Sequence, residues 1–337
     1  MSSELRWLRG AGRRPRYVGF GGAERLFCGI ADLSPWRGTL ERAALAARRN
    51  GATVDDERIL EAWRRLRESL PDTRAALLLY TGFYKDTVLS GIVVGRAPRF
   101  VKVFSADDGQ EEERRRLELL RPIVPREVTL PELSSPAPGI AAYPLLTRSR
   151  RRPTARQLQD VALTIGLNAI HSTPSDSGHS QRDWQSYLGD TAALIRSTEL
   201  AEVDLDRLTG HRPPPAVAHG DFTPWNVFRT GTGELALVDY ERVGLRAPFT
   251  DAWHLATQPR ALRSRASVPD ALIARVSQAA GADAGDVRSW YDAYLLQDLN
   301  QDATDWVVHG RRHPQLRRLI RAKAALLDRH DAPRPAR

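Results

Sequence analysis

Residues 216–229 of this chain read AVAHGDFTPWNVFR, a short apolar run that leads into a histidine, an aspartate and an asparagine. Three prolines precede the stretch, and a turn sequence, TGTGE, separates it from a second apolar run, LALVDYE, at 235–241. Both runs have the length and residue types of β-strands. The polar residues are therefore expected on a loop between two strands, where a rigid scaffold can hold functional side chains in place.

The side chains of this region carry oxygen atoms that suit magnesium. Asp221 and Asn226 lie on the loop, and Asp239 ends the second run, so that a β-hairpin of the two runs would bring all three to one mouth. Carboxylate and amide oxygens are typical ligands of Mg²⁺, which keeps several waters and is completed by substrate phosphates. A carboxylate that holds no metal can accept a proton from a hydroxyl group.

This pattern resembles the loop H-G-D-x-x-P-x-N of the protein-kinase-like superfamily, and within it that of the aminoglycoside phosphotransferase and choline kinase family. The resemblance implies that Asp221 is the catalytic base and that Asn226 and Asp239 bind Mg²⁺. It implies for His219 a structural role, in which hydrogen bonds of this residue brace the loop.

Two further elements extend the resemblance on either side of the loop. PFTDAWHL at 248–255 is similar to the element that follows the catalytic loop in this family, which implies that Asp251 supports the loop from behind. LNAIHSTP at 167–174 is similar to the end of the helix that precedes the loop. The elements occur in the family's order along the chain.

The segment before residue 150 is expected to bind the nucleotide. Residues 75–104 read as three strands, and a charged helix pattern follows at 107–124. The run FVKVF resembles the family's third strand and implies that Lys102 holds the α- and β-phosphates. Only three of the 50 basic residues are lysines, so a lysine between two valines is informative. Its partner on the helix is expected to be Glu113, with Glu112 as the near alternative.

Two loops of this segment complete the expected nucleotide site. YTGFYKDTV at 80–88 stands where the family has its phosphate loop, and it offers Gly82 and Lys85 as phosphate contacts. It lacks the several glycines of protein kinases. AAYPLLTRS at 141–149 is expected to be the hinge whose backbone binds the edge of the base.

The implied fold is α+β: a bilobal protein-kinase-like fold with a small antiparallel β-sheet and one helix in the N-lobe and a mainly helical C-lobe. The N-lobe is assigned to residues 73–147 and the C-lobe to residues 148–337. Residues 1–72 lie outside the resemblance and are expected to form a helical N-terminal extension. Thr53 and Asp56 have the spacing of a capping box at the start of its last helix.

Composition and sequence patterns bear on the binding partners of the protein and on its location in the cell. The formal charge is +9, but the chain has no zinc-finger spacing, no helix-turn-helix signal and no basic run interleaved with aromatics, so no nucleic-acid partner is expected. No apolar run approaches the ~20 residues of a membrane span. The N-terminus lacks an apolar signal core, so a cytoplasmic protein is expected. The single cysteine, Cys28, excludes an internal disulfide.

The sequence therefore predicts a Mg²⁺-dependent phosphotransferase that moves the γ-phosphate of ATP or GTP to an alcohol group of a small molecule such as an antibiotic, a sugar or a nucleoside. One alternative is a kinase-fold enzyme that phosphorylates Ser or Thr of a peptide, docked by the N-terminal extension. Another is a non-catalytic nucleotide-binding scaffold, which the presence of all three polar residues disfavours. The oligomeric state stays open.

The charge of the acceptor also stays open at the level of sequence. Cationic acceptors in this family are drawn in by acidic clusters in the large lobe. Asp298, Asp302 and Asp305 offer one such group, and six acidic residues between 183 and 206 offer another.

Overall fold

The computed structural model describes residues 6–8, 17–20, 56–80, 87–149, 151–173, 181–210, 212–263, 267–308, 310–311 and 313–329. The chain divides into two compact units, which are described separately. Unit 1 comprises residues 1–115, 127–152 and 228–238, and unit 2 comprises residues 116–126, 153–227 and 239–337.

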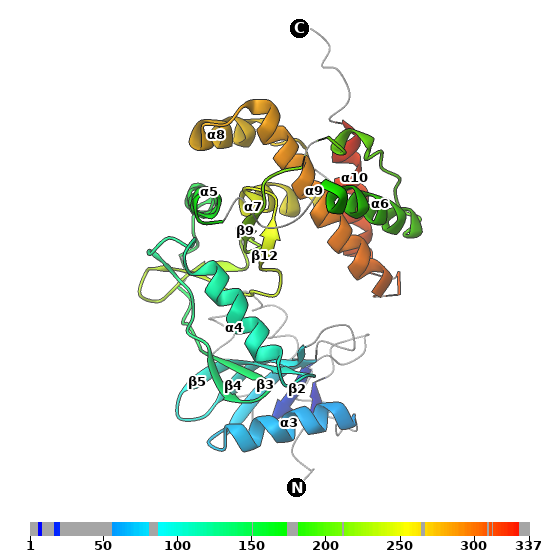
Figure 1. Cartoon of the computed structure of the whole chain (residues 1–337). Helices are drawn as coiled ribbons and strands as arrows, with labels where there is room; N and C mark the ends of the chain where they lie inside the picture. The colour runs from blue at the N-terminus through cyan, green and yellow to red at the C-terminus, as the bar shows by residue number, and fades with distance from the viewer. Residues whose placement is uncertain are drawn as a thin grey trace. The chain divides into compact units, whose positions relative to one another are not determined.

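Unit 1 is built on a seven-stranded antiparallel sheet with the order β1-β2-β3-β4-β5-β8-β7 (Figure 1). The three strands expected within 75–104 are present. Their apolar side chains face a core that includes Leu78, Leu89 and Val101. The strands are β1 (Arg6–Leu8), β2 (Tyr17–Phe20), β3 (Ala75–Tyr80), β4 (Thr87–Val94), β5 (Pro98–Phe104), β7 (Ser134–Ala137) and β8 (Ile140–Pro144).

Helix α3 (Glu57–Ser69) lies along this sheet (Figure 1). The side chain of Asp56 accepts hydrogen bonds from the first turn and caps the helix; the expected Thr53 lies outside the described residues. Ile59 and Leu66 are fully buried in the same apolar cluster as Phe20 of β2. The α3 helix is therefore part of the unit 1 core.

The expectation of a helical extension over residues 1–72 is thus corrected for the described residues. Residues 6–8 and 17–20 form strands, and β2 pairs with β3 of the expected N-lobe. The ring of Phe20 packs on Trp63 of α3 at 4.8 Å between centroids. The physical reason is the pairing of an edge strand. Without β2, the backbone groups of β3 would be unpaired at the edge of the sheet, and such exposed edges are prone to aggregation.

Leu66→Ala is expected to lower the free energy of unfolding by about 2–5 kcal/mol, because it leaves a cavity in the core shared by α3 and the sheet. Chemical denaturation measures the loss. The exposed Arg58→Ala on the same helix is the control and should change stability by less than about 0.5 kcal/mol. A loss at Leu66 as small as the control's would mean that α3 does not belong to this core.

One further pairing differs from the expected one. Residues 126–133 contribute β6 (Val128–Thr129), which joins a separate sheet of order β10-β11-β6. The strand before the loop of Asp221, β9 (Ala216–Ala218), pairs with β12 (Gly244–Arg246). The hairpin of this region is therefore formed by β10 (Val227–Arg229) and β11 (Leu235–Leu237), and β9 is not part of it.

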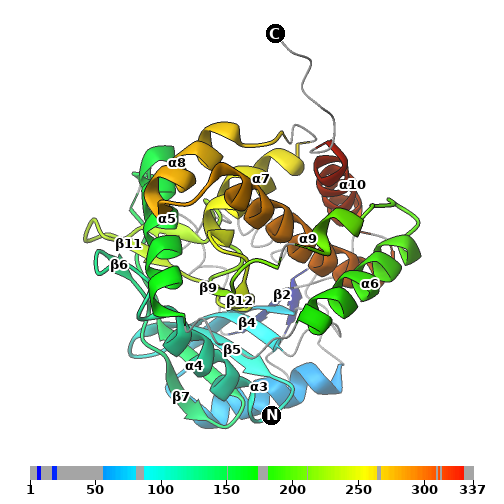
Figure 2. The ribbon, with the colours of Figure 1, turned by 45° about the horizontal axis from the view of Figure 1, so that its top comes forward.

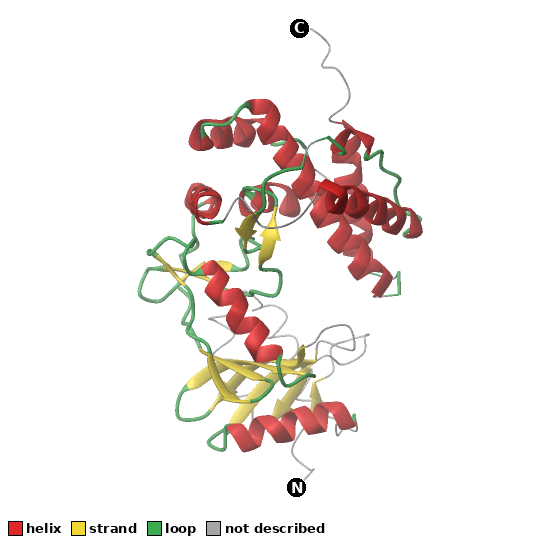
Figure 3. Ribbon diagram, viewed as in Figure 1, coloured by secondary structure: helices red, strands yellow, loops and turns green. Residues whose placement is uncertain are grey.

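Unit 2 is mainly helical, as expected (Figure 3). Large aromatic side chains fill its interior, among them Phe222, Trp253 and Tyr291, all fully buried. Figure 2 shows α9 running past α7 with α10 beside it. The helices are α5 (Ala155–Ser172), α6 (Gln181–Ser197), α7 (Thr250–Ala261), α8 (Asp270–Ala280), α9 (Ala284–Val308) and α10 (Pro314–Arg329). Helix α4 (Gly109–Leu120) has the expected position after β5.

Within the described part of the chain, we find no helix that combines the length and the apolar character needed to cross a membrane.

Candidate active site

The loop that follows β9 is held from behind by one buried carboxylate. The backbone N–H groups of His219 and Gly220 donate to the two oxygens of Asp251, at 3.0 and 2.9 Å. Asp251 lies in the first turn of α7 and is 1% exposed. Two charge-assisted bonds from adjacent amides fix the direction of the backbone just before Asp221.

Gly220 allows this backbone course. Its φ is 80°, a left-handed conformation that favours glycine. A Cβ atom at this position would lie 2.4 Å from the carbonyl oxygen of Arg242. Any side chain at position 220 would therefore force the loop away from the segment that carries Arg242.

Asp221 and Asn226 contact each other directly. The amide nitrogen of Asn226 donates to the backbone oxygen of Asp221 at 2.9 Å and to its carboxylate Oδ2 at 3.0 Å. The backbone N–H of Asn226 donates to Thr223 within the same turn. The ring nitrogen Nδ1 of the buried His219 accepts from the N–H of Asp221 at 3.3 Å. The loop thus fixes the backbone and the side chain of Asp221 together.

The other oxygen of the Asp221 carboxylate contacts a residue of α7. Its Oδ1 lies 3.0 Å from Nε2 of His254. Burial raises the pKa of Asp221, but the hydrogen bond and charge of His254, together with Arg242, outweigh burial and hold this pKa below its ordinary value. Asp221 is therefore ionised at neutral pH, although its side chain is only 24% exposed.

The acidic group expected on α9 does not present its charge to an acceptor. Asp298 is 2% exposed and Asp302 is fully buried, and the buried amino group of Lys323 lies 2.5 Å from each. Asp305 pairs with Arg242 at 3.1 Å. Asp298 and Asp302 are buried with Lys323, and the half-buried Asp305 is paired with Arg242, so the three do not form the exposed cation-attracting cluster considered from the sequence.

In unit 1, Lys102 forms a buried ion pair with Glu113. The Lys102 amino group on β5 donates to Oε1 of Glu113 on α4 at 2.7 Å, and the hydroxyl of Tyr143 on β8 donates to the same oxygen at 2.7 Å. The side chains of the pair are 5% and 1% exposed. Glu112, the near alternative, instead binds Arg115 on the helix surface.

Three predicted site residues remain, namely Gly82, Lys85 and Asp239. Gly82 and Lys85 lie outside the described residues. Asp239 lies two residues beyond β11 with φ of 71°, and it is exposed. The donor set of the expected metal ligands fits magnesium: the bonds from Asn226 to Asp221 use its amide nitrogen, which leaves the side-chain oxygen for a cation, and Asp239 adds an exposed carboxylate.

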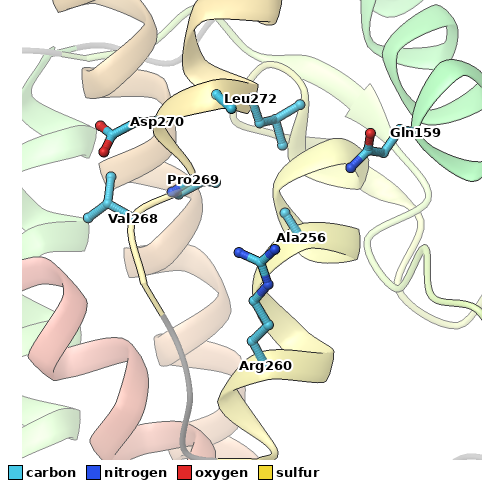
Figure 4. Close-up of a pocket in the computed structure, with 8 residues that line it drawn as sticks. Gln159, Ala256, Arg260, Val268, Pro269, Asp270 and Leu272 are labelled. Atoms are coloured by element: carbon cyan, nitrogen blue, oxygen red, sulfur yellow. The ribbon is translucent and has the colours of Figure 1, made fainter. Parts of the chain in front are cut away.

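Unit 2 also contains a pocket of about 310 Å³, whose lining residues are drawn in Figure 4. It is lined by Gln159 of α5, by Arg260 of α7 and by residues around the start of α8, including Pro269 and Asp270. None of the predicted catalytic or metal-binding residues contributes to its wall. The predicted chemistry therefore does not use this pocket.

A comparison with known protein families matches part of the chain. Residues 154–294 match the sequence profile described as the phosphotransferase enzyme family. The matched residues contain the whole loop around Asp221 and the helix that carries Asp251. The predicted resemblance to the aminoglycoside phosphotransferase and choline kinase family, the kinase-like α+β fold and the enzyme class, a phosphotransferase, are confirmed.

Solved structures that resemble this chain include three enzymes at low identity. A macrolide 2'-phosphotransferase from Brachybacterium faecium is 16% identical, with a TM-score of 0.43, over 77% of this chain and 93% of its own. Choline kinase LicA from Streptococcus pneumoniae is 14% identical, with a TM-score of 0.46, over 80% and 99%. A Plasmodium vivax ethanolamine kinase is 8% identical, with a TM-score of 0.45, over 70% and 78%. No curated protein matches the chain.

The contact of His254 with Asp221 and the partners of Asp298 were not predicted from the sequence. One signal was available: Asp251 and His254 are three residues apart, and residues at this spacing share a face of a helix. The contact between His254 and Asp298 joins positions 44 residues apart on two helices, and no local pattern in the sequence marks it.

Proposed function

We propose that this chain transfers the γ-phosphate of ATP or GTP to a hydroxyl group of a small molecule in a reaction that requires Mg²⁺. The observation that carries the proposal is the loop in which Asn226 binds the Asp221 carboxylate while the buried Asp251 fixes the preceding backbone. Phosphoryl transfer depends on positioning and charge neutralisation more than on covalent chemistry. A rigidly held, ionised aspartate suits that requirement.

In this proposal Asp221 is the catalytic base. Its carboxylate accepts a hydrogen bond from the acceptor hydroxyl and takes the proton as the new oxygen–phosphorus bond forms and the bond to the β-phosphate oxygen breaks. The pKa of Asp221 lies below its ordinary value, so the group is ready to orient a hydroxyl across the neutral pH range.

Binding of the phosphate donor, ATP or GTP, is assigned to the other predicted residues. Asn226 and Asp239 would hold Mg²⁺, which neutralises charge on the phosphates when it is bound. Lys102 would bind the α- and β-phosphates, and Glu113 and Tyr143 fix its position. Gly82 and Lys85 remain proposed phosphate contacts. Because cells keep nucleoside triphosphates in the cytoplasm, we place the reaction there.

A small molecule is preferred as the acceptor over a peptide. The peptide alternative relied on a separate N-terminal extension as a docking segment. In the described parts of that segment, β1 and β2 instead belong to the sheet of unit 1, and α3 packs into its core. The paired aspartates of α9 give no support to a polycationic acceptor, so neutral sugars, nucleosides and macrolide-type antibiotics are the first classes to test.

A mass-spectrometric screen tests the proposal. The full chain is incubated with Mg²⁺ and either ATP or GTP, together with pools of sugars, nucleosides, macrolides, aminoglycosides and Ser/Thr-rich peptides. We expect one small-molecule class to gain a single phosphoryl group, and only when Mg²⁺ is present. Phosphorylation confined to the peptide pool would replace the small-molecule proposal with the peptide one.

Lys102→Met is expected to raise the KM for the nucleotide by roughly 10–100-fold, because a charge-assisted hydrogen bond to phosphate is worth about 1.5–3 kcal/mol. The variant also leaves Glu113 buried without its cation, so stability falls as well. The double variant Lys102→Met/Glu113→Gln separates these effects: it should regain stability in chemical denaturation while its KM stays high. Recovery of a normal KM in the double variant would show that Lys102 has only a structural role.

A further inference from the structure

The Asp221 carboxylate has one partner from its own loop and a second from helix α7. Asn226 binds its Oδ2 atom, and Nε2 of His254 lies 3.0 Å from its Oδ1 atom. His254 is fully buried. Because each oxygen is bound by a different side chain, the carboxylate cannot rotate without breaking a hydrogen bond.

The opposite side of the His254 ring is held by helix α9. Its Nδ1 atom lies 3.3 Å from Oδ2 of Asp298 and 3.4 Å from the hydroxyl of Tyr294. That hydroxyl donates to the same oxygen of Asp298 at 3.1 Å. Lys323 of α10 binds this oxygen at 2.5 Å. The ring is thus fixed at both nitrogens, by groups that are themselves buried and paired.

The charges around His254 favour its protonated form. The ring faces Asp221 on the loop and Asp298 with Tyr294 on α9, and the cations Lys323 and Arg242 lie beyond Asp298. Burial lowers the pKa of His254, but the two carboxylates outweigh burial and raise this pKa above its ordinary value. A protonated ring donates through both nitrogens and so satisfies both carboxylates at once.

We propose that His254 is the positioning residue of the catalytic base: it fixes the Asp221 carboxylate, and Asp298 with Lys323 fixes His254. Four side chains in series thereby connect the catalytic loop to α9 and α10. The assignment of Asp221 as the base rests on the proposed function, whereas the chain of hydrogen bonds does not. Because His254 does not touch the reacting atoms, its loss should lower kcat and leave nucleotide binding intact.

His254→Gln and His254→Leu form a matched pair of variants. Both side chains are close to histidine in size, but only glutamine offers an N–H group at the position of Nε2. The readout is the release of inorganic phosphate from Mg²⁺-ATP or Mg²⁺-GTP, with water as the acceptor, so that no other acceptor is needed. His171→Gln, at an exposed position in the last turn of α5, is the control.

We expect His254→Leu to lower kcat by roughly 10–100-fold with an unchanged KM for the nucleotide, as the loss of an orienting partner does at metal sites. His254→Gln should recover most of the loss. Asp298→Asn should lower kcat in wild type and have little further effect in His254→Leu, because both changes interrupt one chain. Equal kcat values in wild type, His254→Gln and His254→Leu would overturn the proposal.

A second measurement tests the series of hydrogen bonds from Asp221 to Lys323 and needs no enzymatic activity. Side-chain ¹H–¹⁵N NMR of the nucleotide-free protein should show a His254 pKa above the ordinary value of histidine, and Asp298→Asn should lower that pKa. A His254 pKa at or below the ordinary value, or no response to Asp298→Asn, would contradict this series of hydrogen bonds. If wild type transfers no phosphate to water or to any of the pooled acceptors but the NMR result holds, the proposed function fails and the positioning of Asp221 by His254 stands.

Discussion

Replacing Asp221 by asparagine is expected to lower kcat by about 10²–10⁴-fold, the usual contribution of a general base. Asparagine keeps the shape of the side chain, and its amide oxygen can still accept from Asn226 or His254, so the loop should keep its conformation. The amide cannot take the proton of the acceptor hydroxyl. The affinity for Mg²⁺-nucleotide, measured by calorimetric titration, should therefore be unchanged.

Asp286→Asn is the matched control, since Asp286 is an exposed aspartate in the first turn of α9. It removes the same charge from unit 2 and should leave kcat at the wild-type value. If Asp221→Asn retained full kcat, the assignment of the base would be wrong. If it lost nucleotide binding together with kcat, Asp221 would be a ligand of the donor complex instead.

Replacing Lys323 by methionine is expected to lower the free energy of unfolding by about 3–5 kcal/mol, because it leaves carboxylates buried without their cation. The amino group of Lys323 is fully buried and binds both Asp298 and Asp302. The pKa of Lys323 is raised despite burial by these two carboxylates, so the stabilisation that it provides is complete at neutral pH and is lost only as pH rises through that raised pKa.

The free energy of unfolding of the Lys323→Met variant is also expected to depend on pH in a defined direction. Without the lysine the pKa values of Asp298 and Asp302 rise, and carboxyl groups with raised pKa values stabilise the folded state only when they are protonated. The stability deficit relative to wild type should therefore shrink between pH 8 and pH 5. Denaturation of wild type, Lys323→Met and the exposed control Arg321→Met at both pH values measures this. A deficit that does not change with pH would contradict the buried charge network.

The contacts within the loop around Asp221 were predictable because its parts are close together in the chain. Asp221 and Asn226 are five residues apart, and the turn between them forms through local hydrogen bonds. Lys102 and Glu113 were predictable for a related reason: a strand leads directly into a helix, and the scarcity of lysine in this chain made Lys102 conspicuous. Both the loop of Asp221 and the Lys102–Glu113 pair could therefore be predicted from residues close together in the sequence.

The features that the sequence did not predict depend on contacts between distant segments. β2 has only four residues, and its pairing with β3 crosses more than fifty residues of chain. β9 pairs with β12 and not with the nearer strand β11, a choice that no residue pattern in these three-residue strands encodes. Asp298 and Asp302 looked like surface acids, because their partner Lys323 lies on the next helix.

The most direct test of the central claim follows the phosphate itself. Wild-type chain is incubated with Mg²⁺, the pooled hydroxyl acceptors and ATP or GTP that carries the label at either the γ- or the α-phosphate. We predict that label from the γ-position moves to a small-molecule acceptor only when Mg²⁺ is present, and that label from the α-position never moves. A chain that binds neither Mg²⁺-ATP nor Mg²⁺-GTP, or that transfers label from the α-position, would contradict the account.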